Sequence, residues 1–229
     1  MSSAVLLMRL CGPMQSWGTQ SCFSVRDSDR EPSKSGVIGM ICCALGRDRS
    51  EALKDLNDLR MGIRVDKEGE VELDFHTAGG APNKKDGKPE GVYRASGGVK
   101  REGIVSKRYY LADAEFLVGL EGDAELLNKI HYAVANPKWP LYLGRKAFVP
   151  SLPVHIPDGL IEGKSLLKAL KEYPLRRKTS EERNIRVVLE TDDSNHETRN
   201  DVPVSFENRR FSTRQIQNLF VKSSEIGGE

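Results

Sequence analysis

The sequence predicts an α+β protein, and three features of the 229-residue chain indicate this class. Apolar runs with the length of strands alternate with segments whose apolar residues repeat at helical spacing. Hydrophobic residues make up 38% of the chain and charged residues 30%, which is typical of a folded globular protein with a sizeable core. A glycine-rich, basic stretch at residues 77–110 interrupts the alternation and indicates an insertion.

The chain opens with a strand, a loop and a buried helix. Residues 4–10 are nearly all apolar and predict a buried strand, and the loop 11–20 (CGPMQSWGTQ) follows it. Ser33 or Ser35 is suited to cap a helix over residues 35–45, because a serine hydroxyl accepts hydrogen bonds from first-turn amides. This helix is apolar on most sides, which predicts that it is well buried.

Further elements lead to the insertion. Gly46 is suited to end the first helix, and a second short helix is expected over residues 50–59. Residues 60–66 and 70–76 predict two strands joined by the turn 67–69. The insertion therefore starts at the end of the second strand of this pair.

Regular structure is expected again after the insertion. Residues 116–120 alternate as a strand, and the apolar residues of 126–134 repeat at helical spacing. Residues 136–153 are rich in proline and aromatic residues, and we expect an ordered loop there. The order of strand, helix, strand pair, strand and helix predicts a ferredoxin-like βαββαβ unit with an insertion between its central strands.

We divide the chain into two parts on this basis. Residues 1–150 form the ferredoxin-like domain, with the insertion at residues 77–110, and residues 151–229 form a smaller, β-rich C-terminal part. The elements expected in the C-terminal part are a short helix at 163–172 and strands at 185–190 and 202–206 around a polar loop, after which the chain closes on ENRRFSTRQIQNLF.

Charge is distributed unevenly along the chain. The insertion holds eight lysines and arginines and three acidic residues, a net charge of +5, whereas the whole chain carries only +2. The remaining residues therefore carry a net charge of −3. A flexible basic segment on a mildly acidic protein indicates that the insertion contacts a polyanion, because lysines and arginines that neutralise phosphates supply the salt-dependent affinity for nucleic acids.

The sequence favours no metal, cofactor or membrane contact. The cysteines form no CxxC pair and the histidines are scattered, so we expect buried free thiols and no metal site. The longest apolar run, residues 37–45, is too short to span a bilayer, and the N-terminus lacks signal-peptide features. We expect a cytoplasmic protein. The residues concerned are Cys11, Cys22, Cys42, Cys43, His76, His131, His155 and His196.

The start of the first predicted helix is a candidate phosphate site. Its sequence, PSKSG, lacks the glycines of a nucleotide-hydrolysing phosphate loop. Backbone amides at a helix N-terminus can still hold a phosphate, with Arg30 and Lys34 beside them. An ordinary capped helix is an equally good interpretation.

Two kinds of RNA chemistry fit the residues around the insertion. Metal-independent cleavage needs a base, a cation and an acid, which His76, Lys107 and Tyr109 or Tyr110 can supply if they converge. RNA binding without cleavage fits more of the chain. Aromatic residues in or near loops can stack on bases, and a basic run lies near the C-terminus. These residues are Trp17, Tyr93, Trp139, Tyr142, Arg209, Arg210 and Arg214.

Six stretches, in this order along the chain, resemble one family. They are LLMRLCGPMQSWGTQS, REPSKSGVIGMICCALG, DFHT, RYYLADAEFLVGLE, PLYLGRKAFVPSLP and RRFSTR. Together they resemble the CasD family, the type I-E branch of the fifth CRISPR-associated (Cas) protein family. Members are RAMP-superfamily subunits of the CRISPR Cascade surveillance complex. The likeness is weakest between residues 155 and 200.

The resemblance implies a fold, a function and partners. It implies an RRM-like RAMP domain in which residues 77–110 form a β-hairpin thumb. It also implies binding, without catalysis, of the 5′ handle of CRISPR RNA in antiviral defence, where the subunit caps the backbone of the complex. The implied neighbours are the CasC backbone subunit, the large CasA subunit and other Cascade subunits. The alternative is a metal-independent endoribonuclease that processes CRISPR repeat RNA, as in the type I-C branch.

From the residues and the resemblance together we predict the RNA-binding positions. The loop CGPMQSWGTQ is expected at the RNA-binding edge, with Gln15 donating to a base or phosphate and Trp17 offering a flat surface. Arg145 is expected to bind a handle phosphate, with bracing of its own loop as the alternative. The full set is Gln15, Trp17, Arg26, Arg30, Lys34, His76, Arg94, Lys100, Arg101, Lys107, Arg108, Arg145, Lys146, Arg209 and Arg210.

Overall fold

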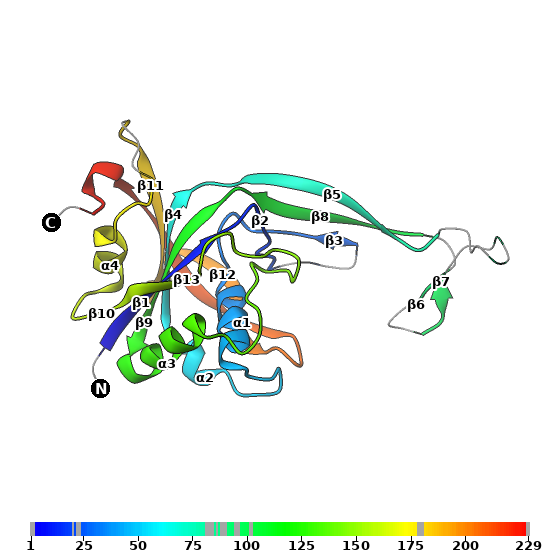
Figure 1. The fold of residues 1–229 in the computed structure, drawn as a ribbon, viewed down its shortest axis with the longest axis horizontal. Coiled ribbons are helices and arrows are strands. Elements are labelled where there is room, and N and C mark those ends of the chain that lie inside the picture. The colour runs from blue at the N-terminus through cyan, green and yellow to red at the C-terminus, as the bar shows by residue number, and fades with distance from the viewer. Residues whose placement is uncertain are drawn as a thin grey trace.

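The structure is a computed structural model of the chain (Figure 1). It describes residues 3–19, 21, 24–80, 85, 87, 91–93, 97–100, 103–177 and 181–227. Strands and a small number of helices form the mixed α+β architecture that the sequence predicts.

A seven-stranded antiparallel sheet is the centre of the fold. Its strand order is β10-β1-β9-β4-β11-β13-β12, so strands from the two ends of the chain lie in one sheet. The N-terminal strand β1 pairs with both β9 and β10, and β4 pairs with β9 and β11. The bounds are β1 Ser3–Cys11, β4 Arg60–Lys67, β9 Glu115–Asp123, β10 His155–Glu162, β11 Asn184–Thr191, β12 Glu197–Ser205 and β13 Arg210–Lys222.

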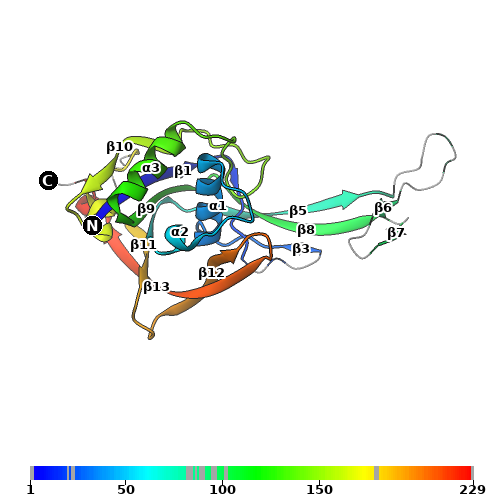
Figure 2. The ribbon, with the colours of Figure 1, turned by 90° about the horizontal axis from the view of Figure 1, so that it is seen from below.

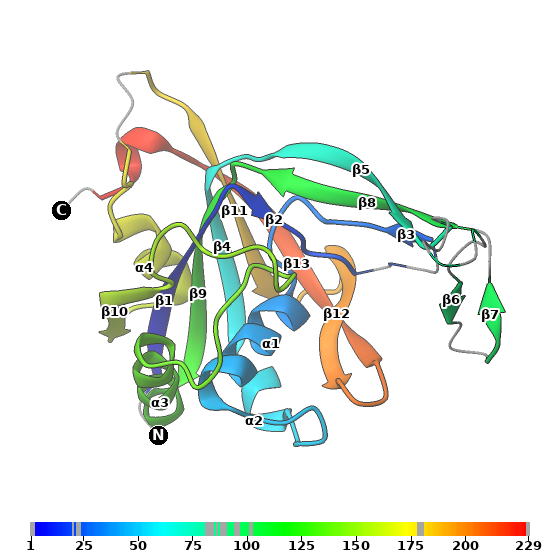
Figure 3. The same cartoon turned by 45° about the vertical axis from the view of Figure 1, so that its right-hand side comes forward.

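Helices cover both faces of this sheet. α1 (Lys34–Leu45) and α3 (Ala124–Ala135) pack on one face, and α4 (Leu166–Glu172) packs on the other (Figure 3). As predicted, Ser33 caps α1, accepting from the Gly36 amide, and Gly46 ends it with a left-handed backbone. Asp123 caps α3 by accepting from the Leu126 amide.

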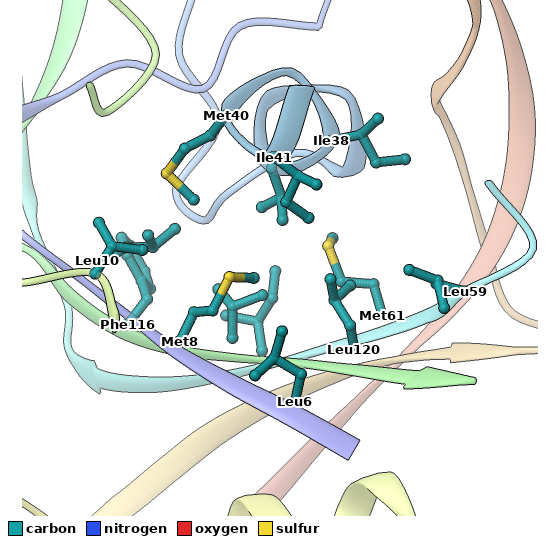
Figure 4. Packing of buried hydrophobic residues seen from close by; sticks show 14 of the residues in the cluster. Leu6, Met8, Leu10, Ile38, Met40, Ile41, Leu59, Met61, Phe116 and Leu120 are labelled. Atoms are coloured by element: carbon teal, nitrogen blue, oxygen red, sulfur yellow. The ribbon is translucent and has the colours of Figure 1, made fainter. Parts of the chain in front are cut away.

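The main core lies between α1 and the sheet. Ile38, Met40 and Ile41 of α1 face Leu6 and Met8 of β1 across this core (Figure 4). The alternate residues of β1 point to the other face, where they pack against α4. Because β1 is buried on both sides, it needs a continuous apolar run, which is what the sequence has.

A long two-stranded ribbon projects from one end of the sheet (Figures 1 and 2). It consists of β5 (Glu70–Ala78) and β8 (Ile104–Ala112), paired in register from Glu70↔Ala112 to Ala78↔Ile104. We call β5 and β8 the hairpin. The hairpin is nine residues long on each side, so it begins earlier and ends later than the predicted insertion at 77–110.

Short strands extend this second sheet. β2 (Met14–Gln15) and β3 (Val25–Arg26) pair with β8 on the edge that β5 leaves open. At the far end of the ribbon, β6 (Val92–Tyr93) pairs with β7 (Val99–Lys100).

Some predicted elements differ from the structure. The expected pairing of 60–66 with 70–76 is wrong, because β4 pairs inside the main sheet and β5 pairs with β8. The expected helix at 50–59 is only one turn, α2 (Lys54–Asn57). The alternating apolar residues of β5 also stay in solvent: Phe75 is 60% exposed.

The C-terminal residues join the main sheet on both sides. They supply β10 at one edge and β11, β13 and β12 beyond β4. The sequence predicted the helix now seen as α4, the strand β11 and the end of β12. It did not predict β10, whose polar residues hide the alternation, and the start of β12 lies where a polar loop was expected. The division of the chain at residue 150 stays a prediction.

Three cysteine thiols are free in the described part of the chain, and Cys22 lies outside it. Cys42 is buried, and this burial raises the pKa of its thiol to about 11. Cys11 and Cys43 are half-buried. Among the helices of the described residues, none has the length and apolar character needed to cross a bilayer.

Candidate functional site

Three arginines line one cavity of about 390 Å³ at the base of the hairpin. Arg26 and Arg108 are register partners in the parallel pair β3–β8, so their side chains emerge on the same face. Arg145 reaches the cavity from the loop between α3 and β10. We call this space the arginine cavity, and its remaining lining includes the first turn of α1.

The Arg145 loop is held in a fixed turn. Phe148 donates its amide to the Arg145 carbonyl at 2.8 Å, and Leu143 donates to the Phe148 carbonyl at 2.8 Å. Gly144 has φ of +86°, and a Cβ there would lie 1.7 Å from the Ser16 carbonyl oxygen. Only glycine suits both the backbone and the space. The loop therefore presents Arg145 at one position.

Arg145 stacks on an aromatic ring of the hairpin. Its guanidinium carbon lies 4.7 Å from the centroid of the Tyr110 ring, a cation–π distance. Tyr110 in turn packs edge-on against Phe148 with ring centroids 5.1 Å apart. The stack orients the guanidinium without using its hydrogen-bond donors on a carboxylate.

Ion pairs among the described residues do not neutralise the three guanidinium groups. Within the described part of the chain, none of them has a carboxylate ion-pair partner. Arg108 donates to the Ser106 hydroxyl at 3.0 Å, a neutral partner. Burial lowers the pKa of Arg145, and the nearby charges of Arg108 and Arg26 lower it further. Asp27 also lines the cavity and accepts from the Ser21 hydroxyl, so three cations face one carboxylate there, and the excess positive charge is suited to an anion.

Gln15 and Trp17, both predicted to contact RNA, form the floor beneath the cavity. Gln15 is 0% and Trp17 1% exposed. The Trp17 indole Nε1 donates to Gln15 Oε1 at 3.0 Å, and Gln15 Nε2 donates to the Ala114 carbonyl at 2.8 Å. A Cβ on Gly36 of α1 would lie 2.8 Å from the Trp17 ring. These side chains thus support the loop and have no free polar surface for a ligand.

Lys34, the other buried candidate, belongs to an ion network. Its Nζ donates to Glu190 at 2.9 Å, and its backbone amide donates to Asp201 at 2.8 Å. Arg214 forms two bonds to Asp201, at 2.7 and 2.9 Å. The carboxylate of Asp201 therefore occupies the start of α1, one of whose two interpretations was a phosphate site, and Arg214 neutralises it. Lys34 and Arg214 hold β11, β12 and β13 against α1.

A second cavity of about 540 Å³ adjoins the arginine cavity and shares part of its lining. Trp139 and Phe211 line it and are 42% and 41% exposed, and Tyr142 also lines it. Arg209, at φ of +50° in the turn between β12 and β13, also lines it. The combination of half-exposed rings and arginines next to a cationic cavity suits stacked bases beside a phosphate backbone.

The hairpin divides the residues proposed for RNA cleavage between its two faces. In the hairpin His76 lies opposite Ser106, while Lys107 lies opposite Phe75 and Tyr109 opposite Leu73. Residues opposite each other in an antiparallel pair share a face, and successive residues alternate. His76 is therefore on one face of the hairpin, together with Tyr110, the alternative acid, and Lys107 and Tyr109 are on the other.

The remaining predicted positions lie at the surface or outside the described residues. Arg30, Lys146 and Arg210 are exposed. Arg94 and Arg101 lie outside the described residues, as does the side chain of Lys100. The structure describes no group of three or more metal-ligating side chains among the residues it covers.

Sequence reasoning missed Phe206 and Phe211, which line both cavities. Phe211 lies inside the RRFSTR run, where the basic residues drew attention and the aromatic residue between them did not. The alternation of charged and apolar residues in that run was the available signal.

Comparison with known proteins places these features in context. Residues 5–218 match the family described as CRISPR-associated protein (Cas_Cas5). The CRISPR system Cascade subunit CasD of Escherichia coli (strain K12) is 31% identical, over 73% of this chain and 76% of that protein.

Two solved structures are similar over nearly the full length. One, titled "Crystal structure of Cas protein", has a TM-score of 0.77 and 38% identity and covers 98% of each chain. The other is a chain of a structure titled "CRISPR RNA-guided surveillance complex". It has a TM-score of 0.77 and 36% identity, and it covers 95% of this chain and 90% of its own.

Proposed function

The chain belongs to the CRISPR-associated Cas5 family, and from this premise we propose that it is a Cascade subunit that binds CRISPR RNA without cutting it. In this proposal it holds the 5′ handle of the RNA in the cytoplasm and caps the backbone of the complex. Its protein partners would be the CasC backbone subunit, the large CasA subunit and other Cascade subunits. A relative that is a Cascade subunit and a similar chain from an RNA-guided complex support the assignment.

The arginine cavity is the observation that carries the proposal. Three guanidinium groups without carboxylate partners in the described chain converge at the hairpin base. Guanidinium groups bind phosphate oxygens through two parallel hydrogen bonds, and one of the three is already oriented by Tyr110. Bases of the same strand would stack in the adjoining aromatic cavity. This arrangement suits a single-stranded RNA whose bases are not paired.

The proposal extends to the fold and the hairpin. The strand order β10-β1-β9-β4, with α1 and α3 on one face, is the arrangement that a ferredoxin-like βαββαβ unit requires, so it supports that finer description. The projecting hairpin would be the thumb, lying over the RNA where it leaves the handle. His76 and Arg108 would face the RNA, since they share the hairpin face with Tyr110.

Arg145→Lys is expected to weaken handle RNA binding five- to thirtyfold, about 1–2 kcal/mol. Lysine keeps the charge but loses the second parallel donor and the flat stack on Tyr110. Fluorescence anisotropy with a handle RNA measures the affinity, and urea unfolding measures stability. Lys54→Arg is the control, because Lys54 is an exposed residue of α2 that does not line the arginine cavity. Lower stability with unchanged affinity would make Arg145 a brace for its loop.

The isolated protein is expected to leave CRISPR repeat RNA intact, with or without EDTA. The reason is that the hairpin separates His76 from Lys107 and Tyr109, so that Tyr110 alone of the other proposed cleavage residues shares its face. Gel electrophoresis of end-labelled repeat RNA after incubation gives the answer. A cut at one repeat position, lost in His76→Ala or Tyr109→Phe, would replace the binding role with the endoribonuclease alternative.

A further inference from the structure

A second cationic region lies at the point where the hairpin leaves the main sheet. Two cavities of about 420 and 190 Å³ share Lys67, Glu115, Arg176 and Arg177 in their lining. Lys67 ends β4 and Glu115 begins β9, so the region sits at one end of the central strands. We call it the β4-end pocket. The arginine cavity contains none of these residues.

Each carboxylate of this pocket already has a cation. Glu115, which is 6% exposed, accepts two bonds from Arg176 at 2.7 and 2.8 Å. Asp113 pairs with Lys67. The third carboxylate, Asp66, pairs with the fully buried Arg64, with Nε to Oδ1 at 2.6 Å. These pairs use every acidic residue that lines the two cavities.

Two arginines remain after this pairing. In the described part of the chain neither Arg177 nor Arg183 forms an ion pair. Arg183 donates one Nη2 bond to the Asp66 carbonyl at 2.9 Å, while its buried Nε has no hydrogen-bond partner among the described residues. A buried guanidinium donor without an acceptor is costly, so Arg183 is a cation of this pocket whose hydrogen-bonding capacity is not fully used among the described residues.

The field in the pocket is positive although it contains acidic groups. A hydrogen bond from Arg176 holds the pKa of Glu115 below its ordinary value, against the opposing effect of burial, and the charges of Arg9 and Arg177 lower it further. Arg177 also lowers the pKa of Asp113, after the larger effect of Lys67. Arg177 thus acts on two carboxylates and pairs with neither.

We propose that the β4-end pocket is a second phosphate-binding site, in which Arg177 and Arg183 contact a phosphodiester of the RNA strand held by the arginine cavity. Gly12 lines the pocket and Ser16 lines the arginine cavity. The chain from Gly12 to Ser16 spans at most about 14 Å. The linings of the two cavities therefore approach each other to within the length of a few nucleotides. That the bound phosphodiester belongs to this RNA strand rests on the proposed function. The affinity of the β4-end pocket for phosphate groups does not depend on it.

The primary test is Arg177→Glu, because Arg177 is exposed and its replacement should leave folding intact. We expect roughly tenfold weaker binding of a single-stranded handle RNA. The slope of log affinity against log salt should fall by about 0.7–1.4, since each lost phosphate contact on a single strand contributes about 0.7. Arg183→Gln should act in the same direction. Lys54→Glu, the matched charge reversal at the other end of β4, should change neither quantity.

Stabilisation of the protein by inorganic pyrophosphate tests the phosphate site independently of RNA. In a background of Arg26→Glu with Arg108→Glu, which removes the arginine cavity as a cation site, pyrophosphate should still raise the melting temperature, and Arg177→Glu should abolish this increase. If wild-type protein binds no RNA, the proposed function fails while the pyrophosphate result stands. If RNA binds with the same salt slope in Arg177→Glu and pyrophosphate stabilisation is unchanged, the pocket is not a phosphate site.

Discussion

Charge reversal of Arg26 and Arg108 together should lower the affinity for handle RNA by at least about a hundredfold. Each arginine can form charge-assisted hydrogen bonds worth about 1.5–3 kcal/mol, and the introduced carboxylates would repel the phosphates. The two are register partners on β3 and β8, so one RNA segment would lose both contacts. The slope of log affinity against log salt should fall by about 1.4 or more.

Filter binding across a salt series would measure this effect. Lys54→Glu with Lys168→Glu makes the same change in net charge at exposed positions on α2 and α4, away from the arginine cavity. This control should bind like the wild type, because contacts with the phosphates are unchanged. Wild-type affinity and slope in Arg26→Glu with Arg108→Glu would remove the arginine cavity as the RNA site.

Replacement of Asp201 by asparagine should cost about 3–5 kcal/mol of the free energy of unfolding. Asp201 is 1% exposed, accepts from the Lys34 amide and pairs twice with Arg214. The asparagine would leave the buried Arg214 without its main counter-charge, and breaking a buried ion pair has this magnitude. Urea unfolding at pH 7 measures the loss. Asp192→Asn, at a side chain that is 94% exposed, should change stability by less than about 0.5 kcal/mol.

The ion pair between Asp201 and Arg214 also makes the free energy of unfolding depend on pH, in a direction that follows from the pKa of Asp201. Burial raises the pKa of Asp201, but the hydrogen bonds and charge of Arg214 outweigh it, so the pKa stays below the ordinary value of 3.8. A carboxyl with a lowered pKa stabilises the fold above its unfolded value and loses this contribution as the pH falls through the folded value. The difference between wild type and Asp201→Asn should therefore shrink below about pH 4. A difference that stays constant down to pH 3 would contradict the assignment.

The sequence was sufficient where local pattern decides the structure. The apolar run of β1 and the capped, apolar α1 are both as predicted, because burial on both faces and a serine cap each have a local signature. The basic insertion also includes Arg108, which lines the arginine cavity, and its contact with RNA stays a prediction. Arg26 and Arg145 were predicted singly, and nothing in the sequence says that they meet.

Long-range partners account for what the sequence could not predict. The sequence alone indicates that Lys34 is an available cation. In the structure it pairs with Glu190, which lies 156 residues later in the chain. Trp17 sits in a polar loop, yet the glycine at position 36 gives its ring a buried place on α1. Whether His76 shares a face with Lys107 depends on the register of the hairpin, and a shift by one residue would reverse the answer.

The strand order of the main sheet has a consequence for how the chain is made. β1 leaves the ribosome first, but its partners β9 and β10 begin at residues 115 and 155. Its buried apolar side chains therefore have no complete sheet neighbour until more than half of the chain has been synthesised. Such distant pairing gives a high contact order, and it slows folding while exposed apolar segments favour aggregation. We expect this protein to depend on chaperones during translation more than a helical protein of equal length does.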